Sequence, residues 1–298
     1  MHTEIGFIGL GRMGLNMVTH LVEGGYRVVA YNRSPEPREV AQKVGALTPA
    51  SLPELISSLA TPRVVMLMVT SGAVDAVLSE LLPLLSPGDT VIEGGNSFYK
   101  ETIPRHQRFN DAGINFLDCG ISGGMSGARH GASIMIGGKE EVFNEHEHIF
   151  KALAIEDGYA RVGNAGAGHF VKMVHNGIEY GMMGAIAEGM NVLHEHEESL
   201  GIDLGQVLKP YEHGSIITSK LMSWTGDAYR EGQVEAIAGI VPRGETEEEM
   251  EHILTIGDVP VLKAALLQRQ ATRENPSYVG KLVASMRNQF GGHKIVEK

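Results

Sequence analysis

Short apolar runs alternate with segments of helical periodicity through the first half of the chain. The apolar runs are rich in β-branched residues, which is typical of buried strands. Strands are predicted at residues 5–10, 27–31, 64–69, 90–92, 115–118 and 133–137, and helices at residues 15–22, 36–44, 53–60 and 73–85. Strands that alternate with helices of this length predict an α/β domain with a parallel, doubly wound sheet.

The pattern changes after about Gly163, where strand signals largely stop. One helical segment without proline runs from His169 to about Leu200, and shorter helices are predicted at residues 209–224, 246–256, 260–272 and 277–289. The glycine-rich segment 162–168 (VGNAGAG) separates the two patterns. We therefore expect an α/β domain over residues 1–165 and an all-α domain with a long central helix over residues 166–298. The acidic run 245–251 is interpreted as a solvated helix start.

Length and composition support two folded domains and exclude several classes of protein. The 298 residues are 43% hydrophobic and 20% charged, as in globular domains and unlike disordered chains. The formal net charge of −11 leaves no excess of cations to neutralise the phosphates of a nucleic acid. No run approaches the ~20 apolar residues of a membrane span, and the N-terminus lacks the basic and apolar regions of a signal peptide.

Cysteine and histidine usage points away from a metal site. Cys119 is the one cysteine, so the chain can form neither an internal disulfide nor a cysteine-based metal cluster, and we expect a reducing, cytoplasmic location. The pairs His146/His148 and His194/His196 have a spacing that puts the two members on opposite sides of a helix. We expect these histidines at the surface and no bound metal.

Residues 9–14 (GLGRMG) have the pattern G-x-G-x-x-G directly after a predicted strand and directly before a predicted helix. In a Rossmann-type fold the first glycine permits a tight turn, the second lets a pyrophosphate approach, and the third lets helix and strand pack closely. The amides at the helix start then bind the diphosphate. The predicted contacts of a dinucleotide are Gly9, Leu10, Gly11, Arg12, Met13 and Gly14, with Val69 and Asn96 at the ends of the third and fourth strands.

The second predicted strand is followed by Asn32, Arg33 and Ser34, where an NAD-binding domain usually has an acidic residue for the ribose 2′-hydroxyl. These three residues offer hydrogen-bond donors and a cation instead, which suit a 2′-phosphate. This pattern favours NADP. NAD stays open, since Arg33 can also stack on the adenine or face solvent.

The long helix carries a narrow polar stripe. At about 100° per residue, His175, Asn176 and Glu179 fall within about 60° of Lys172, and Tyr180 lies at the edge of this sector. A solvated face with a weak Lys–Glu pair is the plain alternative. The glycine- and methionine-rich surroundings, and the position directly after the dinucleotide-binding domain, favour a substrate site.

Two further loops follow predicted strands, at the carboxyl edge where such sheets bind ligands. One is residues 93–97 (EGGNS), and the other is residues 119–124 (CGISGG), which can offer backbone amides to an anion.

Together these segments resemble the 6-phosphogluconate dehydrogenases in their shorter bacterial form, within the β-hydroxyacid dehydrogenase superfamily. GLGRMG, EGGNS, DCGISGG, GHFVKMVHNGIEYG and MRNQFGGH occur in the expected order along essentially the whole chain. The lysine-helix segment is the most specific, because the wider superfamily shares the lysine and lacks the H-N-x-x-E-Y continuation. The resemblance implies oxidative decarboxylation of 6-phospho-D-gluconate to D-ribulose 5-phosphate and CO₂, with reduction of NADP or NAD, in the pentose phosphate pathway or gluconate use.

The resemblance also implies roles for single residues. Lys172 would be the general base and later the general acid, and Glu179 would protonate the enediol. The residues implied to bind substrate hydroxyls and carboxylate are Asn96, Ser122, Gly123, Gly124, His175 and Asn176. Those implied at the substrate phosphate are Tyr180 and Arg269, joined by Arg287 and His293 from a neighbouring subunit, which makes the protein a homodimer at least.

One segment departs from the family pattern. Shortly after the glycine of the segment 240–247 (IVPRGETE), the family has Lys or Arg followed by Trp-Thr, whereas this chain has an acidic residue there, near Glu247. Arg243 is the candidate replacement for that phosphate contact. Two alternatives stay open: a β-hydroxyacid dehydrogenase for a small unphosphorylated acid, which would need neither Arg269 nor Arg287 nor His293, and a non-catalytic NADP-binding sensor.

Overall fold

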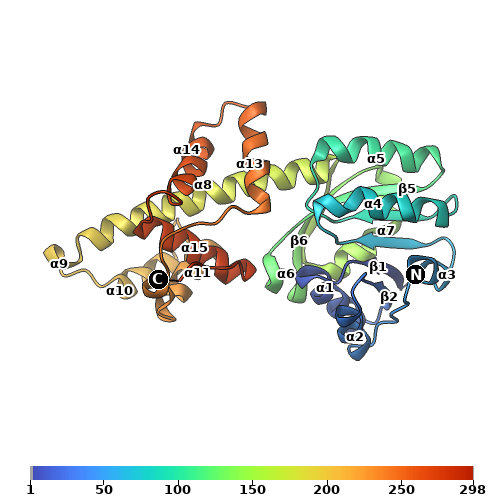
Figure 1. Cartoon of the computed structure of the whole chain (residues 1–298), viewed down its shortest axis with the longest axis horizontal. Coiled ribbons are helices and arrows are strands. Elements are labelled where there is room, and N and C mark those ends of the chain that lie inside the picture. The colour runs from blue at the N-terminus through green and yellow to red at the C-terminus, as the bar shows by residue number, and fades with distance from the viewer. Residues whose placement is uncertain (1–2, 298) are drawn as a thin grey trace. The chain divides into compact units, whose positions relative to one another are not determined.

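Seven strands form one sheet in the first part of the computed structural model, which describes residues 3–297 of the chain (Figure 1). The strands are β1 (Glu4–Ile8), β2 (Arg27–Tyr31), β3 (Val64–Leu67), β4 (Thr90–Glu93), β5 (Asn115–Ser122), β6 (Ala132–Gly137) and β7 (Ala154–Gly163). Their order is β2-β1-β3-β4-β5-β6-β7. The pair β5–β6 is antiparallel and every other neighbouring pair is parallel. The winding direction reverses at β1, so the loops after β1 and β3 border the switch point where such sheets bind ligands.

Packing divides the chain into two units, of which the first ends at Lys172 and the second begins at Met173. The helices of the first unit are α1 (Arg12–Glu23), α2 (Pro35–Lys43), α3 (Leu52–Ser57), α4 (Ser71–Leu81), the 3₁₀ turn η1 (Leu82–Leu84), α5 (Tyr99–Asp111), α6 (Gly124–His130) and α7 (Glu140–Leu153). The predicted domain limit at residues 165/166 falls a few residues earlier and stays a prediction.

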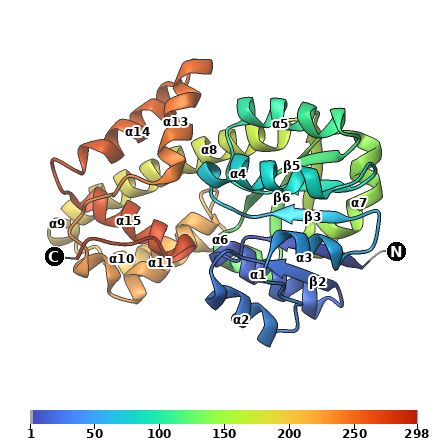
Figure 2. The same ribbon diagram turned by 45° about the vertical axis from the view of Figure 1, so that its right-hand side comes forward.

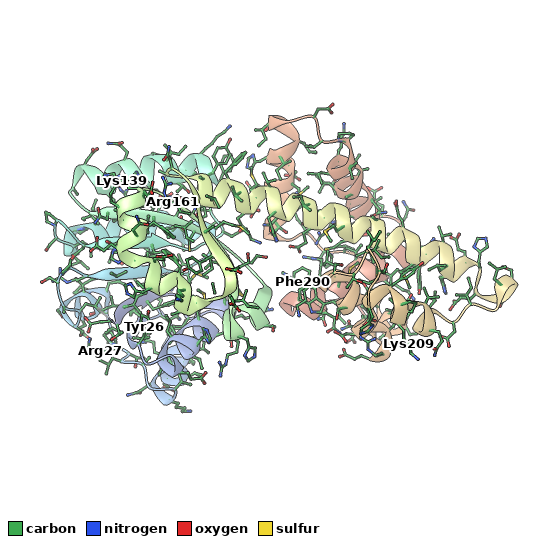
Figure 3. The ribbon with its side chains drawn as sticks, turned by 180° about the vertical axis from the view of Figure 1, so that it is seen from behind. Tyr26, Arg27, Lys139, Arg161, Lys209 and Phe290 are labelled. Carbon is green, nitrogen blue, oxygen red and sulfur yellow. The ribbon has the colours of Figure 1, made fainter. Side chains whose placement is uncertain are left out.

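The strands bury alternate side chains in two cores, one on each face of the sheet. On β1, Ile5 and Phe7 enter one core with α1 and α7, whereas Ile8 enters the other core with α3, α4 and α5. This alternation is the period of two that a strand imposes on its side chains. Helices α4 and α5 cover one face and α1 lies on the other (Figure 2). Tyr26, labelled in Figure 3, lies just before β2. Its hydroxyl donates to the carbonyl oxygen of His148 on α7 at 3.0 Å.

The helical unit begins within α8 (Ala167–Glu195). It continues through α9 (Glu197–Leu200), α10 (Leu204–Glu212), α11 (Lys220–Arg230), α12 (Gln233–Ala236), α13 (Glu245–Ile256), α14 (Pro260–Ala271) and α15 (Tyr278–Gly291). Its core brings Met183 and Met190 of α8 together with Leu208 of α10, Met222 of α11 and Met286 of α15. Among the described residues, no helix, α8 included, combines the length and the apolar composition needed to cross a membrane.

The predicted fold class, an α/β sheet followed by helices with one long helix, is confirmed. One predicted helix, 209–224, is wrong: α10 ends at Glu212, Gly214 has a φ of +75°, and α11 begins after Ser219, whose side chain accepts a hydrogen bond from the amide of Met222. Strand β7 and helices α5, α6, α7 and α12 were not predicted. Strand β7 pairs only with β6 in the sheet and is largely solvent-exposed, so its sequence lacks an apolar run.

The expectation that His146 is a surface residue is also wrong. His146 shares the buried stripe of α7 with Val142, Ile149 and Phe150, and only 6% of it is exposed. Its Nε2 lies 2.8 Å from the hydroxyl oxygen of Thr90. The i, i+3, i+4 spacing of this stripe places the histidine inside, where the hydroxyl satisfies its ring nitrogen.

Candidate active site

The glycine-rich loop lies between β1 and α1. Gly9 has a φ of +101°, and a Cβ at this position would lie 2.3 Å from the carbonyl oxygen of Met68. A Cβ on Gly14 would lie 2.0 Å from the carbonyl oxygen of Gly9, whereas a Cβ on Gly11 would meet nothing within 4 Å. Packing therefore requires the first and third glycines, and the second leaves open space beside the first turn of α1. This is the space that a bound phosphate needs.

The residues after β2 hold this loop and present a cation beside it. The side-chain oxygen of Asn32 accepts a hydrogen bond from the amide of Leu10 at 3.0 Å, so Asn32 has a structural use that the sequence did not reveal. Arg33 and Ser34 follow it and are both exposed.

The other predicted cofactor contacts lie along the same edge of the sheet. Arg12 and Met13 open α1, Val69 lies just after β3, and Asn96 lies just after β4. Since β1, β3 and β4 are parallel neighbours, their carboxyl ends meet at this edge. The open position at Gly11 and these strand ends fit a dinucleotide.

Lys172 lies against β5 because glycines let the two segments approach each other. A Cβ on Gly120 would lie 2.3 Å from the Cβ of Lys172 and 2.8 Å from the carbonyl oxygen of Gly168. A Cβ on Gly168 would in turn lie 2.6 Å from the carbonyl oxygen of Asp118. Only glycine fits at either position, so the first turns of α8 are held directly on the strand.

Asp118 fixes this end of α8 and was not predicted as a site residue. Its Oδ1 accepts from the amide of Gly166 at 2.7 Å, its Oδ2 accepts from the amide of His169 at 3.0 Å, and the residue is 0% exposed. A helix start leaves such amides without intrahelical partners, and a carboxylate there interacts favourably with the helix dipole. The signal in the sequence was a lone carboxylate in the apolar strand that precedes CGISGG.

The predicted serine–glycine loop follows on the same strand. Ser122 is the last residue of β5, and Gly123 and Gly124 have φ values of +116° and +62°. Residues two apart on a strand point to the same face, so Ser122 shares with Gly120 the face that Lys172 covers. The structure thus brings this loop and the lysine together.

A buried charged cluster lies at the end of β4. Glu93 is 0% exposed, and its Oε2 lies 3.7 Å from Nδ1 of His169 and 3.9 Å from Nη1 of Arg105. Burial raises the pKa of Glu93. The cluster links the strand that precedes Asn96 to the first turn of α8.

In the helical unit, α8 carries the rest of the polar stripe. Asn176 is 3% exposed, and its Nδ2 donates to Oε2 of Glu249 on α13 at 2.7 Å. Nδ1 of His175 lies 3.3 Å from Oδ1 of Asn176 and 3.9 Å from Oε2 of Glu179. The predicted residues His175, Asn176 and Glu179 therefore lie close together. Glu249, which was not predicted as a site residue, contacts Asn176.

One turn further along α8, a tyrosine and two arginines form a buried cationic group. The oxygens of the Tyr180 and Thr246 hydroxyls are 2.9 Å apart, and the guanidinium carbon of Arg269 lies 4.1 Å from the centre of the Tyr180 ring. Burial lowers the pKa of Arg269 to about 10. Arg287 is 5% exposed and donates to the carbonyl oxygen of Pro242 at 3.0 Å. The buried Nε of Arg269 has no hydrogen-bond partner among residues 3–297, which suits a bound anion.

The acidic start of α13 is only partly solvated, contrary to the prediction: Glu248 is exposed, whereas Glu247 and Glu249 are buried. Glu247 is 0% and Glu249 is 9% exposed. Glu247 pairs with Arg273 and accepts a hydrogen bond from Nε2 of Gln270 at 3.2 Å. Burial alone would raise the pKa of Glu247, but these two partners outweigh it and leave the pKa below its ordinary value.

Arg243 and His293, both predicted near the substrate phosphate, are exposed. Arg243 donates to Oε2 of Glu251 at 3.1 Å. His293 follows α15, and its ring packs edge-on against Phe290 with 5.6 Å between ring centres. In the described part of the chain, no three His, Cys, Asp or Glu side chains are grouped as a metal ion would require.

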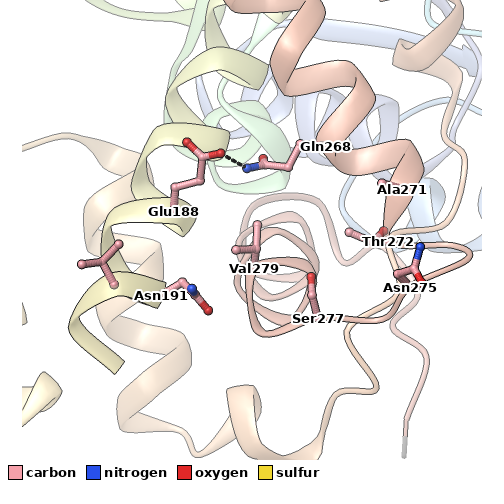
Figure 4. Close-up of a pocket in the computed structure, with 9 residues that line it drawn as sticks. Glu188, Asn191, Gln268, Ala271, Thr272, Asn275, Ser277 and Val279 are labelled. Carbon is pink, nitrogen blue, oxygen red and sulfur yellow. Dashed lines mark hydrogen bonds between the residues drawn. The ribbon is translucent and has the colours of Figure 1, made fainter. Parts of the chain in front are cut away.

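A separate pocket of about 560 Å³ lies between α8, α14 and the start of α15 (Figure 4). Its lining is rich in amides and hydroxyls, and Nε2 of Gln268 donates to Oε1 of Glu188 at 2.7 Å across it. None of the predicted site residues lines this pocket.

Comparison with known proteins identifies relatives of both parts of the chain. Residues 4–163 match the family described as the NAD binding domain of 6-phosphogluconate dehydrogenase, and residues 168–242 match the C-terminal domain of 6-phosphogluconate dehydrogenase. A Bacillus subtilis protein that is provisionally named a 6-phosphogluconate dehydrogenase is 43% identical over 99% of this chain and 100% of its own length. The NAD⁺-dependent decarboxylating 6-phosphogluconate dehydrogenase of Haloferax volcanii is 36% identical over 99% of each chain.

A solved structure of 6-phosphogluconate dehydrogenase from Plasmodium falciparum is similar over 91% of this chain, with a TM-score of 0.83 and 30% identity. The similar part covers 62% of that longer chain. The Plasmodium enzyme has been solved in its apo form, with its cofactor NADP⁺ and with its substrate 6-phosphogluconate.

The contact between Gly120 and Lys172 predicts that a methyl group at this position is not tolerated. Gly120→Ala should lower the free energy of unfolding by about 1–3 kcal/mol, because the added Cβ forces α8 away from β5. Gly189→Ala is the matched control: a Cβ on this α8 glycine meets nothing within 4 Å. It should leave stability unchanged or raise it by up to about 1 kcal/mol. Denaturant titration measures both, and equal stabilities would contradict the close contact.

The Glu247–Arg273 pair predicts a pH-dependent contribution to stability. Because its pKa is lowered in the folded protein, Glu247 stabilises the fold above the unfolded carboxyl pKa of about 4.3, and this contribution is lost as the pH falls through the folded value. Glu247→Gln should therefore cost about 1–3 kcal/mol at pH 7 and progressively less below about pH 4. Unfolding titrations of both proteins across this range provide the test. A difference that grows at low pH would contradict the sign.

Proposed function

The chain belongs to the 6-phosphogluconate dehydrogenase family of oxidoreductases, and from this premise we propose that it oxidises 6-phospho-D-gluconate and decarboxylates the product to D-ribulose 5-phosphate and CO₂. The observation that carries the proposal is the polar stripe of α8. Lys172 is held against Gly120 of β5, and His175, Asn176 and Glu179 follow on the same helix.

The glycine-rich loop, Val69 and Asn96 would hold the dinucleotide, and Arg33 would pair with a 2′-phosphate. When bound there, NADP supplies the acceptor for the hydride that leaves C3 of the substrate. We propose NADP over NAD because the residues after β2 include a cation and no carboxylate.

Lys172 has two successive tasks in this scheme. As the neutral amine it takes the proton of the C3 hydroxyl onto Nζ while C3 is oxidised to a ketone. As the resulting ammonium it donates a hydrogen bond to the ketone oxygen, where negative charge develops as the C1 carboxylate leaves as CO₂. The ammonium then passes its proton to that oxygen to give the enediol. Glu179, in its protonated form, protonates the carbon that lost CO₂, which becomes C1 of D-ribulose 5-phosphate, while Lys172 takes back the enediol hydroxyl proton as the ketone forms.

The remaining residues orient the substrate. His175 and Asn176, with Asn96, Ser122, Gly123 and Gly124, would bind its hydroxyls and carboxylate. Tyr180 and Arg269 would bind the 6-phosphate, joined by Arg287 and His293 of a neighbouring chain, and the unpartnered Nε of Arg269 supports the role of Arg269.

The proposal includes a homodimer in which Arg287 and His293 serve a neighbouring chain. It also includes a cytoplasmic location and a dinucleotide-binding domain over residues 1–165.

The buried carboxylate of Glu247 supports a second candidate function. This buried carboxylate acts electrostatically on both Arg269 and Arg287, and so reduces the positive charge available to a phosphate. A dehydrogenase for a small unphosphorylated β-hydroxyacid would not need that charge. Turnover of 3-hydroxyisobutyrate or glycerate, with none of 6-phosphogluconate, would establish this second function.

The proposed reaction is tested by mixing the protein with 6-phosphogluconate and either cofactor, and following nicotinamide reduction and CO₂ release together. We expect one CO₂ for each cofactor reduced. Reduction without CO₂ would overturn the decarboxylating scheme.

Lys172→Met and Glu179→Gln should each lower kcat by about 10²–10⁴-fold, because each removes a proton-transfer group. Cofactor affinity, measured by fluorescence titration, should change little. Lys209→Met on α10 is a matched control whose exposed amine should not matter for turnover. Wild-type turnover in Lys172→Met would contradict the assigned role and favour a cofactor sensor.

Arg33→Ala should raise the KM for NADP by about tenfold or more, because a charge-assisted contact to the 2′-phosphate is lost. The KM for NAD should stay within about twofold of the wild-type value. Lys43→Ala, which removes an exposed cation at the end of α2, should change neither. Equal weakening of both cofactors by Arg33→Ala would show that the 2′-phosphate assignment is wrong.

A further inference from the structure

Glu249 is a buried carboxylate to which neither the sequence motifs nor the proposed chemistry assigns a task. It lies on α13, is 9% exposed, and accepts a hydrogen bond from Nδ2 of Asn176 on α8 at 2.7 Å. Both residues belong to the helical unit, and Asn176 is itself 3% exposed.

This hydrogen bond fixes which way the Asn176 amide points. An ionised carboxylate can only accept hydrogen bonds, whereas an asparagine amide has a donor end and an acceptor end. Glu249 therefore holds the NH₂ group, and the oxygen of the amide has to point the other way. On that side, Oδ1 of Asn176 lies 3.3 Å from Nδ1 of His175.

The orientation of the amide in turn determines which ring nitrogen of His175 carries the proton. An amide oxygen beside Nδ1 requires a donor, so the neutral ring is protonated at Nδ1. Oε2 of Glu179, 3.9 Å from the same nitrogen, acts in the same direction. The lone pair is then on Nε2, where it can accept a hydrogen bond from a hydroxyl group.

We propose that Glu249 is a positioning residue: through Asn176 it holds His175 in the Nδ1–H tautomer and so presents Nε2 as an acceptor to a hydroxyl of the substrate. The part of the proposal that concerns the substrate rests on the proposed function, in which His175 binds a substrate hydroxyl. The tautomer itself does not depend on the reaction.

The rest of α13 is anchored independently of this contact. Thr246 meets the hydroxyl of Tyr180, and Glu247 pairs with Arg273. Loss of the Glu249 carboxylate should therefore release the amide of Asn176 while α13 stays in place.

The tautomer of His175 is measured by ¹⁵N NMR of histidine-labelled protein without substrate, with the His175 signals assigned by their absence in His175→Gln. In the wild type, Nδ1 should carry the proton. In Glu249→Met, which keeps the length of the side chain and removes the acceptor, the Nε2–H form should rise. Glu249→Gln should restore the wild-type tautomer, because its side-chain oxygen can still accept.

Glu248→Met is the matched control, since Glu248 is the exposed neighbour on the same helix. It should leave the His175 signals unchanged. A wild-type protein with the proton on Nε2 would overturn the proposal without any variant, and so keeps it testable if Glu249→Met fails to fold. An unchanged tautomer in a folded Glu249→Met would overturn it as well.

Steady-state kinetics tests whether Nε2 of His175 accepts a hydrogen bond from the substrate. Glu249→Met should raise the KM for 6-phosphogluconate by about tenfold, with kcat within about twofold of wild type, because one oriented hydrogen bond to the substrate is lost. Glu249→Gln should recover most of this loss. If the wild type does not turn over 6-phosphogluconate, the proposed function fails while the NMR result still decides the role of Glu249. A changed tautomer with unchanged KM would overturn the substrate part alone.

Discussion

The contact between the first turns of α8 and strand β5 determines where Lys172 lies. Two features act together there: Asp118 accepts hydrogen bonds from the amides of Gly166 and His169, and the missing side chain of Gly120 leaves room for the stem of Lys172. The Asp118 carboxylate binds the amides at the start of α8. Gly120 determines how closely α8 approaches β5. This contact therefore fixes the position of Lys172 relative to β5.

This contact lies next to a concentration of buried charge. Glu93 and Asp118 occupy paired positions on β4 and β5, and both are fully buried. Two neighbouring carboxylates in a dry interior are costly unless cations or amides face them. Asp118 has the helix amides, and Glu93 has Arg105 and His169 within 4 Å. The buried charged cluster therefore adds side-chain contacts between the paired strands β4 and β5 and the first turn of α8.

The parts of the fold and site that could be predicted from sequence depend on short-range patterns. The glycine-rich loop, the alternation of strands and helices, and the polar stripe of α8 are each contained within one segment. The buried position of His146 was missed because only its spacing to His148 was considered. Its spacing to Val142, Ile149 and Phe150 places it in the apolar stripe of α7. Strand β7 was missed because no residue of it is fully buried, so its sequence has no apolar run. Its strand conformation shows only in the pairing with β6.

Helix α13 shows most clearly why the remaining contacts could not be predicted. A run of carboxylates is ordinarily solvated, and nothing within the segment distinguishes Glu247 and Glu249 from the exposed Glu248. Their partners, Arg273 and Asn176, are 26 and 73 residues away in the chain. The predicted substrate groups lie on α8, whereas α13 supplies the carboxylate that accepts from Asn176 and the carboxylate that acts electrostatically on Arg269 and Arg287 near Tyr180. Glu247 lies in the segment 240–247, where the sequence departs from the family pattern, so this departure bears directly on the charge around Arg269 and Arg287.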